Sequence, residues 1–451
     1  MRKRNGFRLI AILMLIASIT IAGCSKSTSS ETPPSKESLK GKTVTVLLSA
    51  GGVGQFNAWK DRAKDFTKKT GINVKFIETP YENLLQNITT DGISNRGEYD
   101  LTVYLDTMGP SISQFLQPLD QYVKRDKIDL KEWPGAVLDE SKYNGKLISM
   151  PVRAHVQMLF YRKDIFNKLQ ITPPTTWAQL EDDSKKITQD TGISGIVPYY
   201  APGNNGQNLY MWTAYLWSNG GDIFDKNMKP IFNNKQGVEA TQRYIDLLVK
   251  DKVAPQGSTT FGEQDSRTFF KQGKAAMWLG WWWVYPEFNN PEQSAKDVAG
   301  NVGYAPVPGW EGKQSTSNVS SFPLAMMKDS KNKDAAWEVL KWISSSSEEL
   351  DIATKSLKNT IPAKDQNLVV TQMTNLRNKQ LNDLSGGFFN VAADNFANGR
   401  HLPLIKEWPQ VSDAISSAIS KMSTGQPVEP TLNEAAKQVE QIMKAAGYYK
   451  K

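Results

Sequence analysis

Four tryptophans are crowded into one short stretch of this chain, and their side chains suggest a specific kind of recognition. Residues 271–288 read KQGKAAMWLGWWWVYPEF and hold Trp278, Trp281, Trp282 and Trp283. The face of an indole can bury an aliphatic C–H patch of a sugar ring while the sugar hydroxyls stay free to form hydrogen bonds. Core packing is the ordinary alternative for each tryptophan taken alone. Because three consecutive side chains cannot all face one cleft, we expect at least one of residues 281–283 to face a ligand and at least one to pack inside or shield a rim.

Side chains that would support catalysis are not arranged in a recognisable pattern. A glycosidase needs two carboxylates a fixed distance apart, and no acid lies beside the tryptophans before Glu287. The two histidines, His155 and His401, lack a setting for Ser-His chemistry, and metal-ligand spacing is missing. We therefore expect a binding protein without catalytic residues, cofactor or metal. A membrane-anchored, extracellular polysaccharide-degrading enzyme is the alternative from another class, and a lipoprotein for peptides or a metal ion is a third.

The N-terminus carries the pattern of an export signal. Four basic residues precede an apolar run at residues 9–22, which is shorter than the roughly 20 residues needed to span a bilayer. The run ends in IAGC at residues 21–24, and small residues before a lone cysteine resemble a bacterial lipobox. We expect a signal peptide at residues 1–23, a lipid such as palmitate on Cys24 and a flexible tether at residues 24–40. An ordinary signal peptide that happens to end near a cysteine is the alternative.

This leader predicts where the mature protein works. A lipid on its N-terminal cysteine would hold it on the outer, extracellular face of the cytoplasmic membrane, as in a Gram-positive bacterium. The leader cysteine is the only one in the chain, so the mature protein has no thiol left to oxidise.

The charge balance argues against nucleic acid as a partner. The full chain has a net charge of +8, and without its four basic leader residues it has 50 Lys and Arg against 46 Asp and Glu. No block of Lys or Arg stands out. A mildly basic chain of this length does not suggest nucleic-acid binding, while a slight preference for an anionic ligand stays open.

Alternating strands and helices must position these side chains. Apolar, β-prone runs at residues 43–48, 72–77 and 100–105 are separated by helical patterns at 56–66 and 81–93. Such a β-α-β-α-β run predicts a parallel sheet with right-handed crossovers. The mature chain is longer than one hydrophobic core normally serves, so we expect two α/β lobes.

A glycine-rich loop, SAGGVG at residues 49–54, follows the first predicted strand. Its spacing is not that of a nucleotide-binding fingerprint, and no P-loop lysine follows it. The loop is either a plain strand-to-helix turn or backbone that approaches a ligand at the carboxyl end of a strand. In the second interpretation Gly51 and Gln55 are candidate ligand contacts.

Several segments, in their order along residues 40–450, resemble one family. The family is that of the extracellular solute-binding lipoproteins of bacterial ABC importers, in the carbohydrate-binding branch that includes the maltose-binding protein (solute-binding protein family 1). The segments that carry the resemblance are KGKTVTVLLSAGG, FNAWKDRAKDFTKKTGINV, YNGKLISMPVRAHVQMLFYRKDIFNKLQITPPTTWAQL, FNNKQGVEATQRYIDLL, FFKQGKAAMWLGWWW, VGYAPVPGW, KDAAWEVLKWISS and GQPVEPTLNEAAKQVEQIM.

The resemblance implies a fold and a function. The fold is the type II periplasmic-binding-protein fold, with two discontinuous, doubly wound α/β lobes joined by hinge strands and a ligand cleft between them that closes by hinge bending. The implied function is that of a monomer that captures an oligosaccharide or polyol and delivers it to the permease subunits of an importer. The implied lobes are residues 41–152 with 310–364 and residues 153–309 with 365–451, with chain crossings near 151–154, 307–309 and 361–366.

The resemblance also implies ligand contacts. In the family, an aromatic residue just after the Gly-Lys-Ala-Ala-Met run stacks on the sugar; an ungapped match points to Trp283, and alignment of the glycine points to Trp282. Tyr104 and Asp106 fall where the family has an aromatic and polar sugar contacts, and Tyr199 matches a stacking tyrosine. The amide side chains of Asn204 and Asn205 form either a plain loop or a rim of donors that suits sugar hydroxyls.

Two basic residues depart from the pattern of the family. His155 stands where the maltose-binding protein carries an acidic residue, and Arg153 lies two residues before it. Basic side chains in place of an acid leave an acidic or uronic sugar open as the ligand. The structural alternatives are a hinge salt bridge for Arg153 and a satisfied, buried imidazole for His155.

Overall fold

The structure is a computed structural model that describes residues 35–51, 54–203 and 206–449. The predicted signal peptide and the predicted lipid site at Cys24 lie outside the described residues, as do Asn204 and Asn205. No helix of the described part of the chain is long and apolar enough to cross a membrane.

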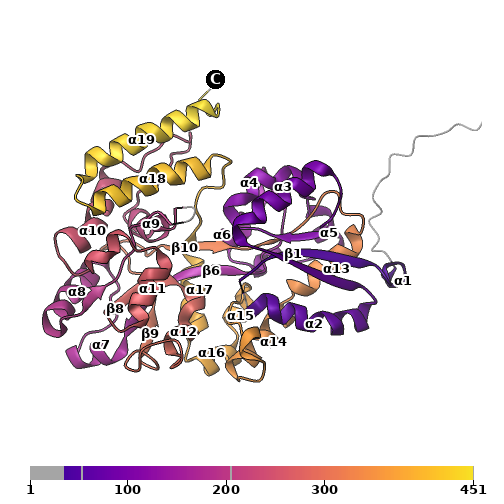
Figure 1. The fold of residues 1–451 in the computed structure, drawn as a ribbon, viewed down its shortest axis with the longest axis horizontal. Coiled ribbons are helices and arrows are strands. Elements are labelled where there is room, and N and C mark those ends of the chain that lie inside the picture. Colours follow the sequence, from indigo (N-terminus) through magenta and orange to yellow (C-terminus); the bar gives the residue numbers. More distant parts are fainter. Residues whose placement is uncertain (1–34, 52–53, 204–205, 450–451) are drawn as a thin grey trace, which may run out of the picture. The chain divides into compact units, whose positions relative to one another are not determined.

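The first sheet contains the strands that the sequence predicts (Figure 1). Strand β1 (Thr43–Ser49) pairs in parallel with β2 (Asn73–Thr79) and β3 (Leu101–Val103), and β11 (Leu324–Met326) pairs antiparallel with β3. Val46 of β1 packs with Trp59 of α2 (Gly54–Thr70), whereas Leu47 packs with Ile88 of α3 (Leu84–Ser94). Helices therefore cover both faces of this sheet, which explains why β1 is apolar at successive positions.

The second sheet is centred on β6 (Ala154–Arg162). Its order is β12 (Gly399–Arg400), β10 (Ser317–Ser321), β6, β8 (Ala275–Trp281) and β7 (Ser194–Ile196), and β9 (Val302–Ala305) also pairs with β6. Leu159 of β6 packs with Trp212 of α9 (Asn208–Ser218), whereas the next residue, Phe160, packs in a different cluster with Phe288. Both faces of this sheet are thus buried as well.

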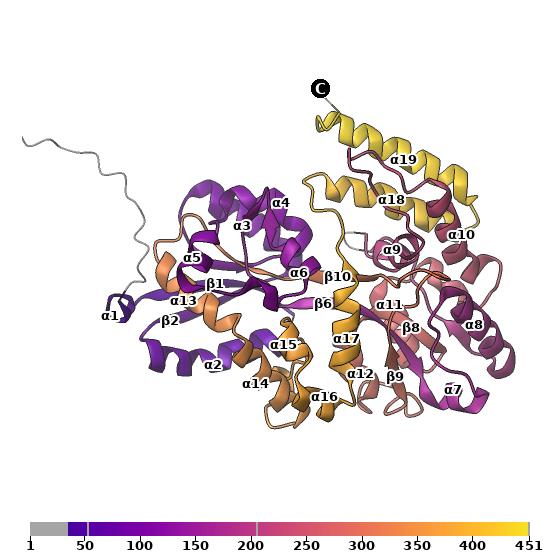
Figure 2. The ribbon, with the colours of Figure 1, turned by 180° about the vertical axis from the view of Figure 1, so that it is seen from behind.

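Further helices complete the two lobes. Near the first sheet, α13 (Lys333–Ile343) contributes to the same core as α2. Beside the second sheet, α18 (Trp408–Ser423) and α19 (Val428–Ala445) pack side by side and against α9 and α10 (Lys235–Val249) (Figures 1 and 2). The other elements of the described residues are α1 (Lys36–Leu39), α4 (Gly109–Ile112), α5 (Asp120–Asp126), α6 (Gly135–Glu140), the hairpin β4–β5 (Lys142–Tyr143, Lys146–Leu147), α7 (Lys163–Leu169), α8 (Trp177–Thr191), α11 (Glu263–Lys271), α12 (Tyr285–Asn289), α14 (Ser346–Leu357), α15 (Met373–Leu376), α16 (Lys379–Ser385) and α17 (Phe388–Ala397).

The chain passes from the first sheet to the second between Met150, which bridges to β11, and the start of β6 at Ala154. The return passage differs from the expectation. Residues 317–321 form β10 and pair with β6, and residues 324–326 form β11 and pair with β3. The return therefore runs through residues 322–323, so the crossing predicted at 307–309, and with it the first-lobe segment predicted to start at 310, is wrong. The prediction failed because the sequence of a short strand carries no signal for the sheet that the strand joins. The remaining lobe boundaries stay a prediction.

Candidate ligand-binding cleft

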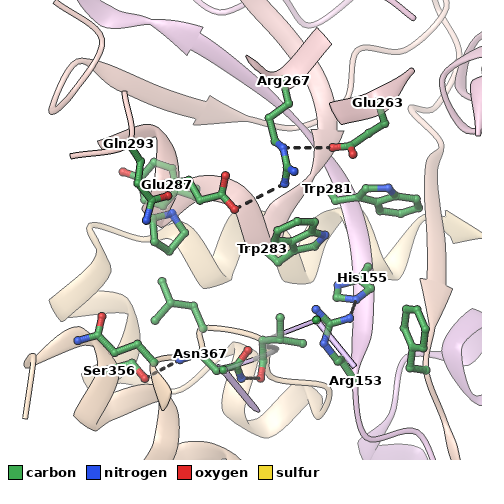
Figure 3. A pocket seen from close by; sticks show the side chains of 18 of the residues that line it. Arg153, His155, Glu263, Arg267, Trp281, Trp283, Glu287, Gln293, Ser356 and Asn367 are labelled. Carbon is green, nitrogen blue, oxygen red and sulfur yellow. Dashed lines mark hydrogen bonds and ion pairs between the residues drawn. The ribbon is translucent and has the colours of Figure 1, made fainter. Parts of the chain in front are cut away.

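A cavity of about 1030 Å³ lies where segments of both sheets meet (Figure 3). Its walls come from the loop after β1 with the first turn of α2, the start of β6, the end of β8 with α12, the end of β10, and residues 356–369. Ligand pockets of drug-sized molecules typically measure about 300–1,000 Å³. This cavity therefore has room for a ligand of more than one sugar ring.

As expected from the sequence, the three consecutive tryptophans do not all face the cavity. Trp281 ends β8, and Trp282 begins a short 3₁₀ turn that leads into α12. Trp281 and Trp283 line the cavity, and Trp282 does not. Trp282 is 1% exposed, and its ring packs at 5.9 Å parallel to Phe388 and edge-on to two other phenylalanines of α17. The expected ligand contact of Trp282 is therefore wrong, because the indole is enclosed by aromatic residues from a distant part of the chain.

A positively charged side chain covers one face of the Trp283 ring. The guanidinium of Arg267 lies over this ring, 4.8 Å from its centroid, which is a cation–π contact. Arg267 is itself positioned by Glu263 at 3.8 Å and by Glu287 at 3.5 Å, and Glu287 also pairs with Lys271 at 3.2 Å (Figure 3). One face of Trp283 is thus covered, and the other is the face on which a ligand ring could stack.

Arg153 and His155 form the basic part of the cavity wall. Nη1 of Arg153 lies 2.5 Å from Nε2 of His155, and its Cζ lies 5.4 Å from the centroid of the Phe322 ring. Burial, together with the positive charge of Arg153, holds the pKa of His155 well below its usual range. His155 is therefore neutral at pH 7, and its Nε2 can accept the hydrogen bond that Nη1 of Arg153 donates. Burial lowers the pKa of Arg153 to about 10, so the guanidinium stays charged.

The other predicted contacts fall into two groups. Gly51 and Tyr199 line the cavity. The φ angle of Gly51 is +129°, a conformation that favours glycine, and the hydroxyl of the fully buried Tyr199 has no hydrogen-bond partner among the described residues.

Gln55, Tyr104 and Asp106 do not line the cavity. Nε2 of Gln55 donates to the carbonyl of Val152 at 2.7 Å, and the hydroxyl of Tyr104 lies 2.8 Å from Oγ of Ser149. Asp106 is 1% exposed and accepts from the amide of Thr107 at 2.8 Å. These polar groups therefore form hydrogen bonds within the protein. Their predicted ligand contacts are inconsistent with this structure, because all three side chains are buried and those of Gln55 and Tyr104 bond to distant parts of the chain.

Comparison with known proteins assigns the chain to a family. A family model described as bacterial extracellular solute-binding protein matches residues 50–349. This chain belongs to that family. Solute-binding proteins of ABC transporters bind a small molecule and deliver it to a membrane permease, and the two-lobed type II fold expected from the sequence is confirmed by solved structures.

Three proteins illustrate what this solute-binding protein is similar to. The galactooligosaccharide-binding protein of Bacillus subtilis is 27% identical over 342 residues, which is 73% of this chain and 75% of that protein. The maltose-bound protein MalE3 of T. maritima is 25% identical with a TM-score of 0.74, covering 89% of this chain and 100% of the other. A solute-binding protein of Agrobacterium radiobacter K84 in complex with ribitol is 26% identical with a TM-score of 0.73, covering 90% and 99%.

Sequence reasoning missed several residues that line the cavity of this solute-binding protein. They are Tyr81, Tyr210, Glu263, Arg267, Tyr285, Glu287, Asn289, Asn290, Gln293, Phe322, Asn359, Gln366 and Asn367. The amide groups among them had a local signal, because Asn289-Asn290 is the same kind of amide pair as Asn204-Asn205. Arg267 and Phe322 had none, since only the packing of distant segments brings them to Trp283 and Arg153.

Proposed function

We propose that this protein is the substrate-binding lipoprotein of an ABC importer and that its ligand is a carbohydrate, either an oligosaccharide or a polyol. In this proposal Cys24 carries the lipid that holds the protein at the outer face of the membrane. The protein acts as a monomer, closes on its ligand and presents the closed form to the permease. Closure is favoured because the ligand contacts both lobes at once.

One observation carries the proposal: Trp281 and Trp283 line one cavity together with a rim of amide side chains. Indole faces suit the C–H patches of a sugar, and amides both donate to and accept from hydroxyls. The relatives named above, which bind a galactooligosaccharide, maltose and ribitol, support the same ligand class. The family favours binding over catalysis. The two carboxylates of the cavity wall, Glu263 and Glu287, both pair with Arg267, which supports the same choice.

A thermal-shift screen of residues 25–451 tests the ligand class. The panel contains neutral oligosaccharides, polyols and uronic-acid oligosaccharides, and isothermal titration calorimetry follows each hit. A ligand at a hundred times its Kd adds about 2.7 kcal/mol to the free energy of unfolding, which is readily visible as a higher Tm. No shift with any carbohydrate contradicts the proposed ligand class. Release of shorter sugars from a polysaccharide by the purified protein contradicts binding as its sole activity.

The lipid anchor is tested separately on the full chain in a Gram-positive host. The Cys24→Ser variant should appear in the culture medium, whereas the unchanged protein should stay in the membrane fraction and carry the mass of an acylated cysteine. Equal membrane retention of both proteins contradicts the anchor.

A further inference from the structure

Charged side chains line the cavity, and all but one of them are paired with an opposite charge. Arg267 lies between Glu263 and Glu287, and Glu287 also pairs with Lys271. Lys364, at another part of the wall, pairs with Asp61 at 2.9 Å and with Asp365 at 2.6 Å. These groups neutralise one another, so they provide little net charge for a ligand.

Arg153 is the exception among the described residues that line the cavity. No carboxylate of the described part of the chain pairs with it, and the only polar partner of its side chain there is the neutral ring of His155. Its Nε is buried without a hydrogen-bond partner, and Nη2 has none among the described residues. Arg153 is partly buried, and a charged group that is partly withdrawn from water carries a desolvation cost that a partner of opposite charge would offset.

The guanidinium of Arg153 is held in a fixed position, which defines the nitrogen atom that a ligand could contact. Nη1 is occupied by His155, and the ring of Phe322 lies against the guanidinium, so the side chain is held in place. Nε has no surface that a ligand could reach, so Nη2 is the nitrogen without a protein partner that remains for a ligand. A charged N–H group of a guanidinium forms a strong hydrogen bond with a carboxylate oxygen.

The same site lies next to the aromatic wall. The ring of His155 is 6.2 Å from the ring of Trp281 and 6.4 Å from that of Trp283, centroid to centroid (Figure 3). A ligand ring stacked on these indoles would therefore bring a substituent at its edge close to Arg153. One unpaired positive charge is balanced by a single negative charge, which favours a carboxylate over a phosphate ester that can carry two.

We propose that Arg153 is an anion-binding residue and that the carbohydrate of this protein carries a carboxylate, as in a uronic-acid oligosaccharide. His155 and Phe322 position the guanidinium, and the indoles of Trp281 and Trp283 take the sugar ring. This inference rests on the proposed function, because it specifies the carbohydrate that the same cavity binds.

A double-mutant cycle between protein and ligand tests the inference by isothermal titration calorimetry. The probes are oligouronides of two to four residues from pectin, alginate and glucuronan, the same oligouronides with methyl-esterified carboxyls, galacto- and malto-oligosaccharides, ribitol and a sugar phosphate. The protein variants are Arg153→Gln, Arg153→Lys and the exposed control Arg96→Gln.

We expect one acidic oligosaccharide to bind the unchanged protein. Esterification should weaken its binding about 100-fold, since a charge-assisted pair is lost. Arg153→Gln should weaken binding of the free acid to a similar extent but leave binding of the ester nearly unchanged. Arg153→Lys, which keeps the charge but not the planar guanidinium held by His155 and Phe322, should fall between these limits. Arg96→Gln should bind as the unchanged protein does. Without ligand, Arg153→Gln should lower Tm only slightly, because it removes the hydrogen bond to His155 and the contact with Phe322 but no ion pair.

Other outcomes overturn the inference in different ways. Tight binding of a neutral sugar that Arg153→Gln leaves unchanged overturns the anion site and leaves the proposed function standing. Binding of the sugar phosphate but of no uronide overturns the carboxylate. A Tm several degrees lower for Arg153→Gln without ligand shows that Arg153 serves the fold. Failure of every carbohydrate to bind contradicts the proposed function itself, and the inference falls with it.

Discussion

Trp282 and Trp283 are joined by one peptide bond, yet their indoles serve different parts of the molecule. The ring of Trp282 packs parallel to Phe388 at 5.9 Å, and its Nε1 donates to the carbonyl of Ala154 at 3.2 Å. The ring of Trp283 lines the cavity under the guanidinium of Arg267. Neighbouring substitutions should therefore separate stability from ligand binding.

Trp282→Ala should lower the free energy of unfolding by about 3–5 kcal/mol, because it leaves a large void among aromatic side chains. Trp283→Ala should change that free energy by less than about 1.5 kcal/mol and weaken ligand binding at least about tenfold, because a stacking face is lost. Chemical denaturation and calorimetric titration of both variants measure the two effects. Similar losses of stability in the two variants would show that Trp283 also belongs to the core.

Arg267 should support the orientation of Trp283. Its guanidinium contacts Glu263 and Glu287 as well as the indole, so Arg267→Gln removes a cation–π contact of about 0.5–2 kcal/mol. The substitution also takes the Arg267 partner from Glu263, whereas Glu287 keeps its pair with Lys271. We expect weaker ligand binding, about 3- to 30-fold, and a shift in tryptophan fluorescence of the free protein. The control is Lys185→Gln, since Lys185 pairs with Asp251 away from the cavity wall. Unchanged affinity and fluorescence in Arg267→Gln would contradict this role.

Gly54 is required for the close approach of α2 to residues 365–366. A Cβ atom added at Gly54 would lie 2.1 Å from the carbonyl oxygen of Gln366, so the backbone would have to move. Gly54→Ala should therefore lower the free energy of unfolding by about 1–3 kcal/mol. Gly135, at the start of α6, has nothing within 4 Å of such an atom, and Gly135→Ala should be neutral or stabilising by up to about 1 kcal/mol. Urea denaturation of the pair measures the difference, and equal effects would contradict the close approach.

Asp126 should make the stability depend on acid pH. Although burial opposes it, hydrogen bonds from Arg125, Lys341 and Trp337 lower the pKa of Asp126 to about 2, from its ordinary value of 3.8. Because the pKa is lower in the folded state, the stabilisation is complete above about pH 4 and is lost as the pH falls through 2. Asp126→Asn should cost about 1–2 kcal/mol at pH 7 and flatten this part of the pH profile of unfolding. An unchanged profile in the variant would assign the acid sensitivity to other carboxyl groups.

Part of the fold could be predicted because it is local. The alternating strands and helices of residues 43–105 gave the parallel order of β1, β2 and β3, since period and turn residues are properties of a short stretch. The return passage could not be predicted in the same way. Strands β10 and β11 are separated by only two residues and join different sheets. A strand as short as these carries no sequence signal for the sheet edge that it joins.

The sequence by itself determined that one member of the tryptophan run had to turn inward and that the chain is a two-lobed member of its family. The resemblance also predicted that His155 stands where the maltose-binding protein carries an acidic residue. Only the tertiary structure decided that Trp282 is the buried member and that Arg153 has no carboxylate partner among the described residues. It also decided that Gln55 and Tyr104 bond to other parts of the chain and that Asp106 is buried. The physical reason is that burial and charge pairing depend on side chains far apart in the chain. Phe388 and Phe322 reach Trp282 and Arg153 only after both sheets have formed.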